Sequence, residues 1–199
     1  QNLSWPNYLI WSKIQLDFIN KISIVKHETY IIGPITDTGD NKVSINSQKK
    51  IISIFDIQPH RSSKYNTDLT DHIFSPPNSV NFIKDITSSC DLNNYICILK
   101  RKRDISNNLH PVYKHFINKL ITKNILSSYD YDDDIKDILR KSDLVVCAPY
   151  TSVAHIAFQL GVKCIYYDAS STIDVSDKAR HGIKMISGKN KLNEFIKKI

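Results

Sequence analysis

Apolar runs rich in β-branched residues recur along the chain and alternate with stretches of helical periodicity. The runs predict strands at residues 30–35, 51–57, 95–99, 144–148, 164–167 and 183–186. The stretches between several of them predict helices at residues 9–22, 79–87, 111–123, 133–141, 152–160 and 191–199. Strands that are apolar along their whole length are typical of parallel sheets covered on both faces. The alternation therefore predicts an α/β fold with a doubly wound, mostly parallel sheet.

The length of 199 residues fits one domain of ordinary size. We expect a single Rossmann-like domain over residues 1–199, with residues 1–25 forming a helix that packs on it or joins it to another domain. The chain begins with Gln1, and its first residues lack the sections of a signal peptide. We therefore expect it to be a fragment of a longer polypeptide. A loop rich in Asp, Asn and Ser is predicted at residues 36–48.

The composition excludes an integral membrane protein. Hydrophobic residues make up 41% of the chain and charged residues 24%, and no apolar run approaches the roughly 18 residues that span a bilayer. The 4 cysteines show no CxxC spacing, and three of them lie in apolar runs, where a free thiol packs as a small hydrophobe. We expect a cytoplasmic protein without a structural metal, in at most peripheral contact with the inner membrane.

Lysine is spread along a chain whose net charge is +7, but one basic cluster stands out. The basic cluster at residues 100–103 directly follows the predicted strand 95–99. Such a cluster attracts nucleic acid, anionic lipid headgroups or phosphate esters by the same electrostatics. Aromatic residues that would stack on single-stranded bases are not interleaved with it. The charge alone leaves the partner open.

Polar residues gather where the predicted strands end or the following helices begin. In open parallel sheets, ligands bind beyond the carboxyl ends of the strands, where the loops converge. The candidate binding residues are His60, Arg61, Lys100, Arg101, His110, Pro111, Tyr150, Thr151, Ser152, Asp168, Ser170 and Ser171. No GxGxxG, GxxxxGK[ST] or GxSxG motif occurs, so a dinucleotide oxidoreductase, a P-loop enzyme and an α/β-hydrolase lose their main support.

Two of these groups stand at predicted helix starts. Thr151 and Ser152 can cap free backbone N–H groups, and the same N–H groups together with the helix dipole can bind an anion. Pro111 fixes the start of another helix. His110, just before it, either caps that helix or forms a hydrogen bond to an anion or a ribose. Capping and ligand binding both remain open for each.

The other candidates lie in loops. His60 and Arg61 can hold a phosphate or a sugar carboxylate, which Arg binds bidentately, or they belong to a solvated loop. Asp168 either caps the turn at residues 170–171 or contacts a ribose. The acidic run at residues 129–134 lacks the glycine and the distal Glu of a calcium loop, which favours a solvated helix start without a metal.

The segment SDLVVCAPYTS at residues 142–152, with Leu160-Gly161 and the YYDASS stretch at residues 166–171, resembles a known family. It is similar to bacterial surface-polysaccharide biosynthesis proteins named for a Pro-Phe-Thr-Ser motif. Tyr150 replaces the Phe and keeps an aromatic ring. Residues 5–8, 32–35, 55–61 and 100–111 are also similar to the family. The resemblance thus covers most of residues 5–171.

The resemblance implies a glycosyltransferase of the GT-B arrangement, in which two Rossmann-like domains face each other. This chain would be the C-terminal half, which binds the donor nucleotide. The His-Pro element and the hydroxyl-rich helix start also resemble the CMP-binding elements of sialyltransferase-like and Kdo-transferase-like enzymes. By that analogy His110 contacts the phosphate or ribose of CMP, and Thr151 and Ser152 contact the phosphate. His60 and Arg61 would meet the carboxylate of the sugar or the leaving phosphate.

The implied donor is a CMP-activated nonulosonate or Kdo sugar, and no metal or other cofactor is expected. The implied acceptor is a glycan of a capsule or O-antigen, either lipid-linked or free, held by an N-terminal acceptor domain outside these residues. Because the general base of similar enzymes commonly comes from the acceptor domain, we expect the isolated segment to be inactive. No base can be named from this half.

Two other functions remain open. A non-catalytic α/β interaction module could use residues 100–103 to hold nucleic acid or an anionic surface, and its nucleic-acid binding should weaken steeply with salt. A sugar-nucleotide epimerase would need catalytic carboxylates and a His at the strand ends, where the sequence places only Asp168.

Overall fold

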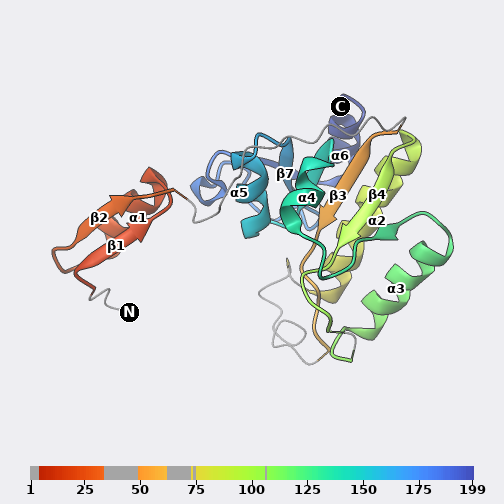
Figure 1. The fold of residues 1–199 in the computed structure, drawn as a ribbon, viewed down its shortest axis with the longest axis horizontal. Coiled ribbons are helices and arrows are strands. Elements are labelled where there is room, and N and C mark those ends of the chain that lie inside the picture. The colour runs from red at the N-terminus through yellow and green to blue at the C-terminus, as the bar shows by residue number, and fades with distance from the viewer. Residues whose placement is uncertain (1–4, 34–48, 62–72, 74, 106) are drawn as a thin grey trace.

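The computed structural model describes residues 5–33, 49–61, 73, 75–105 and 107–199. Within these ranges a six-stranded sheet has the order β5-β4-β3-β6-β7-β8, and every neighbouring pair is parallel. Its strands are β3 (Ile51–Phe55), β4 (Ile96–Lys100), β5 (Ser127–Ser128), β6 (Leu144–Cys147), β7 (Cys164–Asp168) and β8 (Lys184–Ser187). The predicted doubly wound, parallel α/β fold is confirmed (Figure 1).

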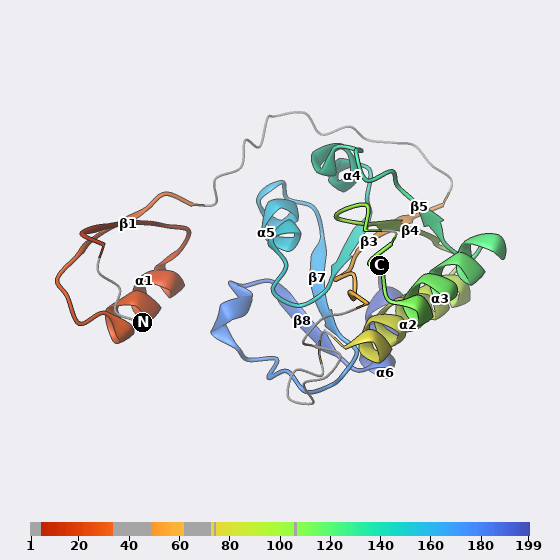
Figure 2. The same ribbon diagram turned by 90° about the horizontal axis from the view of Figure 1, so that it is seen from below.

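Helices cover both faces of this sheet (Figure 2). One core cluster joins the sheet to α2 (Pro76–Leu92), α3 (Pro111–Thr122) and α6 (Lys189–Ile196). A second cluster joins the other face to α4 (Ile135–Arg140) and α5 (Ser152–Gln159). Along β6, Leu144 and Val146 face the first cluster and Val145 and Cys147 the second, so the whole strand is buried and reads as one apolar run.

The order of the strands reverses next to β3. From β3 the chain builds outward through β4 to β5, and it then returns to place β6 on the other side of β3. Phe55 at the end of β3 lies beside Cys147 at the end of β6. The loops that follow these two strands therefore lead in opposite directions, which opens a crevice at the carboxyl edge of the sheet.

Residues 5–33 form a separate small unit, called here the N-terminal unit, beside the α/β body of residues 49–199 (Figure 1). It consists of β1 (Asn7–Ile10), α1 (Lys13–Ile22) and β2 (Glu28–Ile31), with the two strands parallel. The helix predicted from residue 9 begins at Lys13, because Ser12 caps it by accepting a hydrogen bond from the Gln15 N–H. The strand predicted at residues 30–35 thus contributes β2 to this unit rather than to the main sheet.

Other differences from the sequence prediction concern boundaries. Helix α2 begins at Pro76 because proline suits the first turn of a helix. The short strand β5 and the 3-10 helix η3 (Lys178–Arg180) were not predicted, since two or three residues show no periodicity. The loop predicted at residues 36–48 lies outside the described residues.

Candidate functional site

A cavity of about 990 Å³ opens at the carboxyl edge of the sheet. The loops after β3, β4, β5 and β6 line it together with the first residues of α4 and α5. It brings together five predicted site residues: His60, Lys100, Tyr150, Thr151 and Ser152. Lys102 and Arg103 add positive charge to its wall, and Asp133 and Asp134 add negative charge.

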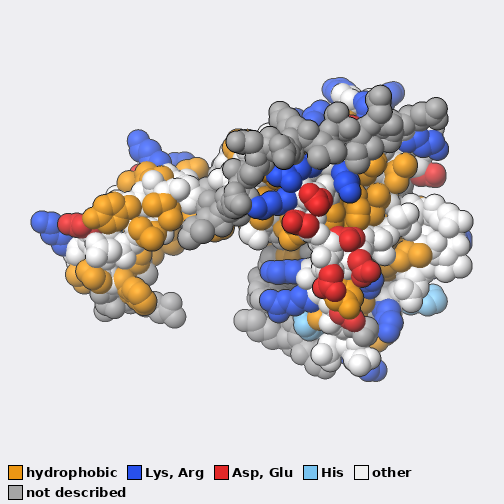
Figure 3. Space-filling model, in the orientation of Figure 1, with side chains coloured by type: hydrophobic (Ala, Val, Ile, Leu, Met, Phe, Trp, Pro, Cys, Tyr) orange, Lys and Arg blue, Asp and Glu red, His pale blue; other side chains and the backbone are white. Residues whose placement is uncertain are grey.

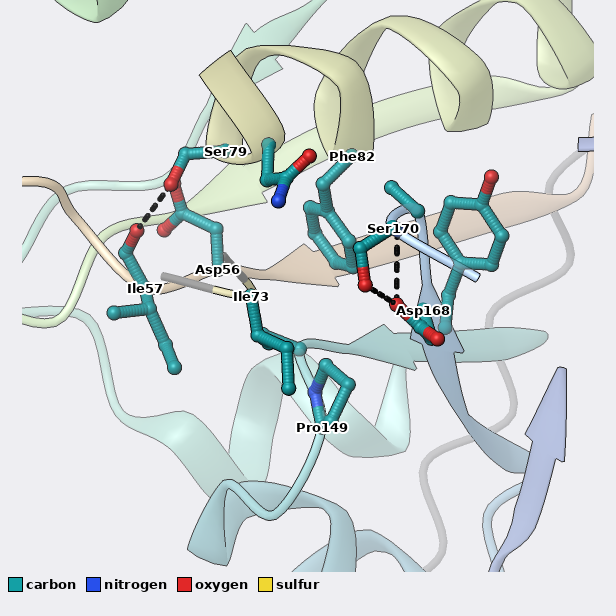
Figure 4. A pocket seen from close by; sticks show the side chains of 12 residues that line it. Asp56, Ile57, Ile73, Ser79, Phe82, Pro149, Asp168 and Ser170 are labelled. Carbon is teal, nitrogen blue, oxygen red and sulfur yellow. Dashed lines mark hydrogen bonds between the residues drawn. The ribbon is translucent and has the colours of Figure 1, made fainter. Parts of the chain in front are cut away.

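A second, much smaller cavity of about 20 Å³ lies at the ends of β3, β6 and β7 (Figure 4). It has room for about one water molecule. Two predicted site residues, Asp168 and Ser170, line it. Asp56 and Ile57 line both cavities, so the end of β3 lies between them.

The turn before α5 presents the start of that helix to the larger cavity. Tyr150 has a left-handed backbone (φ 62°), and its hydroxyl donates a hydrogen bond of 2.6 Å to Asp177. Burial and the nearby Asp177 raise the pKa of Tyr150 to about 12. The Thr151 hydroxyl donates to the Ala148 carbonyl at 2.9 Å and does not cap the helix, and Ser152 is exposed. The first N–H groups of α5 are therefore not capped by Thr151.

The basic cluster divides into two kinds of residue. Lys100 is buried, and its ammonium group donates to the carbonyls of Asp130 (2.6 Å) and Tyr131 (2.5 Å), which fixes the loop between β5 and α4. Lys102 and Arg103 are exposed at the wall of the larger cavity. Lys100 thus stabilises a loop that lines the larger cavity, whereas Lys102 and Arg103 are accessible to an anionic ligand.

His110 and Pro111 stand on the same edge, but they line neither described cavity. His110 precedes α3 and donates its backbone N–H to the Pro59 carbonyl at 2.9 Å. Its buried Nδ1 has no hydrogen-bond partner among the described residues. Arg61 donates its backbone N–H to Asn108 at 2.6 Å, so the loops after β3 and β4 are joined.

Asp168 organises the turn that follows β7. One carboxylate oxygen accepts the Ser170 N–H at 2.9 Å, and the other accepts the Ile173 N–H at 2.9 Å. Ser171 in this turn is exposed and has a left-handed backbone (φ 58°). Of the two alternatives predicted for Asp168, its hydrogen bonds therefore match the capping of the turn. Asp168 also lines the smaller cavity.

The structure adds two residues that were not predicted, Asp56 and Tyr113. Asp56 follows the last residue of β3 and is buried, and its carboxylate accepts a hydrogen bond from the Tyr113 hydroxyl. Burial raises the pKa of Asp56 to about 6, while the hydrogen bond from Tyr113 and the charge of Arg101 act in the opposite direction. The one signal in the sequence was an acidic residue inside an apolar run, since Asp is seldom fully buried without a partner.

The fold is that of a doubly wound α/β domain with a polar crevice at its strand reversal. Comparison with protein families matches residues 1–196 to the family described as polysaccharide biosynthesis PFTS motif protein. The chain belongs to this family. No curated protein matches the sequence.

Solved structures share the fold at low sequence identity. Sucrose-phosphate synthase from Thermosynechococcus elongatus has a TM-score of 0.56 and 10% identity, over 97% of this chain and 48% of that chain. UDP-GlcNAc 2-epimerase from Methanocaldococcus jannaschii has a TM-score of 0.53 and 14% identity, over 96% of this chain and 54% of that chain. A weaker match, below the similarity that indicates a shared fold, is the wall teichoic acid polymerase TagF, with a TM-score of 0.47 and 14% identity over 97% of this chain and 48% of that chain.

The chain thus spans about half the length of the solved structures that it matches. The predicted Rossmann-like fold, as in one half of a GT-B structure, is confirmed, and at these identities the similarity extends to the fold alone. None of the described helices combines the length and apolar character that crossing a bilayer requires.

Proposed function

We propose that this chain is the donor-nucleotide-binding part of a glycosyltransferase that builds bacterial surface polysaccharide, such as capsule or O-antigen. The observation that carries the proposal is the cavity of about 990 Å³ at the strand reversal, lined by hydroxyl groups, cations and the start of α5. Its volume lies in the upper part of the range of small-molecule sites. Membership of the polysaccharide biosynthesis family gives the biological setting.

The chemistry that this part would supply is stabilisation of the leaving phosphate. Backbone N–H groups at the start of α5 and the dipole of that helix favour an anion. Lys102 and Arg103, exposed on the cavity wall, add two positive charges. These groups would neutralise the charge that develops on the phosphate as the glycosidic bond breaks, without a bound metal. Deprotonation of the acceptor hydroxyl would fall to an acceptor domain in the rest of the protein.

The donor that we propose is a CMP-linked nonulosonate or Kdo sugar. Its support is the similarity of the His110-Pro111 element and of the Thr151-Ser152 helix start to CMP-binding elements. The sugar carboxylate of such a donor would meet the cationic side of the site, where His60 lines the cavity. A donor without a carboxylate would leave that contact unused, so comparing the two kinds of donor tests this step.

Binding calorimetry with CMP, UDP, GDP and UMP in parallel tests the proposal. We expect CMP alone to bind clearly, and Ser152→Ala and Lys102→Gln each to weaken it by about tenfold or less, the effect of about 1.4 kcal/mol. Lys197→Gln is the matched control, because Lys197 is an exposed residue at the end of α6. Binding of no nucleotide, together with steeply salt-dependent binding of an oligonucleotide, would instead support a non-catalytic interaction module.

A further inference from the structure

Asp56 and Asp168 are two buried carboxylates that line the same small cavity, and they differ in how they are satisfied (Figure 4). The oxygens of Asp168 accept backbone N–H groups from Ser170 and Ile173. In Asp56, Oδ2 accepts the Tyr113 hydroxyl, but Oδ1 has no hydrogen-bond partner among the described residues. Both oxygens of Asp168 thus have hydrogen-bond donors within the protein, whereas only one oxygen of Asp56 has a donor among the described residues.

A buried acceptor without a partner destabilises the folded protein, so its presence needs an explanation. Asp56 is only 8% exposed, and it follows the central strand β3 at the point where the strand order reverses. It also borders the larger cavity, into which the start of α5 opens. Because Asp56 lines both cavities, a molecule bound in the larger cavity would lie next to this side chain.

The type of ligand group follows from charge. A carboxylate repels phosphate, so Asp56 is not suited to the phosphate, which the proposed function assigns to Lys102, Arg103 and the start of α5. A ligand hydroxyl is neutral and donates a hydrogen bond, and hydrogen bonds to an ionised acceptor are stronger than those between neutral groups. The hydroxyl-bearing part of a nucleotide sugar has the required chemistry.

We propose that Oδ1 of Asp56 accepts a hydrogen bond from a hydroxyl group of the bound nucleotide sugar and thereby selects the ribose or the sugar by its hydroxyl pattern. This inference rests on the proposed function and adds to it a residue that determines specificity. Tyr113 is the positioning residue, because its hydroxyl holds Oδ2 from the first turn of α3. The carboxylate is thereby fixed with Oδ1 left for the ligand.

The test compares CMP with 2′-deoxy-CMP and 3′-deoxy-CMP, and with a CMP-sugar, by calorimetry. We expect the wild type to prefer CMP over one deoxy analogue by about tenfold, because a carboxylate left without its donor is costly. Asp56→Asn, which keeps the size of the side chain, should remove that preference while leaving binding of the deoxy analogue nearly unchanged. If the contact is to a sugar hydroxyl, Asp56→Asn should instead remove only the extra affinity of the CMP-sugar over CMP.

Two further measurements keep the test decisive. Asp85→Asn is the control carboxylate, since Asp85 accepts the Tyr167 hydroxyl at 2.8 Å and lines neither of these cavities. The second is the hydroxyl preference of the wild type between pH 8 and pH 5, which needs no variant. The preference should weaken toward pH 5 as Asp56 is protonated, and the phosphate titrates equally in both nucleotides. Arg101 and Tyr113 act on Asp56, and Asp168 lies across the small cavity.

The outcomes separate the two proposals. If the wild type binds CMP and Asp56→Asn binds every ligand with the same preferences, the role of Asp56 is overturned and the proposed function stands. If the wild type binds no nucleotide at all, both proposals fall. If Asp56→Asn does not fold, a wild-type preference that stays constant from pH 8 to pH 5 overturns the role of Asp56.

Discussion

The N-terminal unit and the α/β body are built from the same strand–helix–strand pattern but bury their apolar residues to very different extents. In the body, Leu144 and its neighbours in β6 are fully buried. In the N-terminal unit, α1 has no buried residue, and Leu9 and Phe18 are 65% and 60% exposed. Figure 3 shows hydrophobic side chains gathered on the surface of this unit. The strand–helix–strand pattern therefore forms a core only where layers cover both faces of the sheet.

The described contacts between the two parts centre on two histidines of the body. The Ser12 hydroxyl and His181 Nδ1 form a hydrogen bond of 2.9 Å, and the rings of Trp11 and His155 are 5.8 Å apart. A two-stranded sheet is at best marginally stable alone in water. We therefore expect the unit to open at lower denaturant concentrations than the body.

Leucine truncations in the two parts should show the largest difference. Leu144→Ala leaves a cavity in a fully buried layer and should cost about 2–5 kcal/mol in the free energy of unfolding of the body. Leu9→Ala removes an exposed side chain and should cost less than about 0.5 kcal/mol. Urea unfolding followed by far-ultraviolet circular dichroism reports mainly on the body.

Tryptophan fluorescence provides the second probe in this experiment. The chain has 2 tryptophans, Trp5 and Trp11, and both lie in the N-terminal unit. Leu144→Ala should shift the circular dichroism transition and leave the fluorescence transition in place. A shift of both transitions by the same amount would show that the two parts unfold as one cooperative unit.

The sequence predicts the body better than the N-terminal unit for a physical reason. Continuous apolar runs such as residues 144–148 can be stable only between two helical layers, so they indicate both a strand and its place in the sheet. Leu9 and Ile10 fit a helix and a strand equally well, and the Ser12 cap decides between them. A β-branched run at residues 30–35 does not reveal which sheet it joins. The prediction that residues 1–199 form one domain of a longer chain stays a prediction.

The site is predictable where it depends on local sequence. The strand, turn and helix start at residues 144–152 are adjacent in the chain, so their order alone places Tyr150, Thr151 and Ser152 at the rim. Asp56 depends on Tyr113, which lies 57 residues away and reaches it only through the packing of α3. The buried role of Lys100 is equally difficult to predict from local sequence, because the carbonyls that accept its hydrogen bonds come from the loop after β5.

A smaller effect, about 1 kcal/mol, is expected from removing one helix cap in each part. Asp134 caps α4 by accepting the Lys136 N–H at 2.7 Å, so Asp134→Ala should move the circular dichroism transition. Ser12 caps α1 and also contacts His181, so Ser12→Ala should move only the fluorescence transition. An equal response of both probes to Ser12→Ala would show that the contact with His181 couples the two parts.

The smallest effect is expected from protonation of the two histidines, since both remain partly exposed and solvent screens their repulsion. The ring centroids of His155 and His181 are 5.1 Å apart. Burial lowers the pKa of both groups, and the neighbouring His181 lowers that of His155 further. The two histidines therefore take up protons more readily when the N-terminal unit has separated from the body than when the two parts are in contact. The contact should be intact above the ordinary histidine pKa of about 6.5 and weaken as the pH falls through it.

Trp11 fluorescence in a Trp5→Phe background, measured from pH 8 to pH 5, reports on this contact. The groups that face the histidines are Trp11 and Ser12 from the N-terminal unit and Tyr166 from β7. His181→Asn should flatten the pH profile, because Asn tolerates the left-handed backbone of this position (φ 49°) and carries no titrating ring. His27→Gln is the control, as His27 packs on Tyr8 within the unit. An unchanged pH profile in His181→Asn would mean that protonation of these rings does not weaken the contact between the two parts.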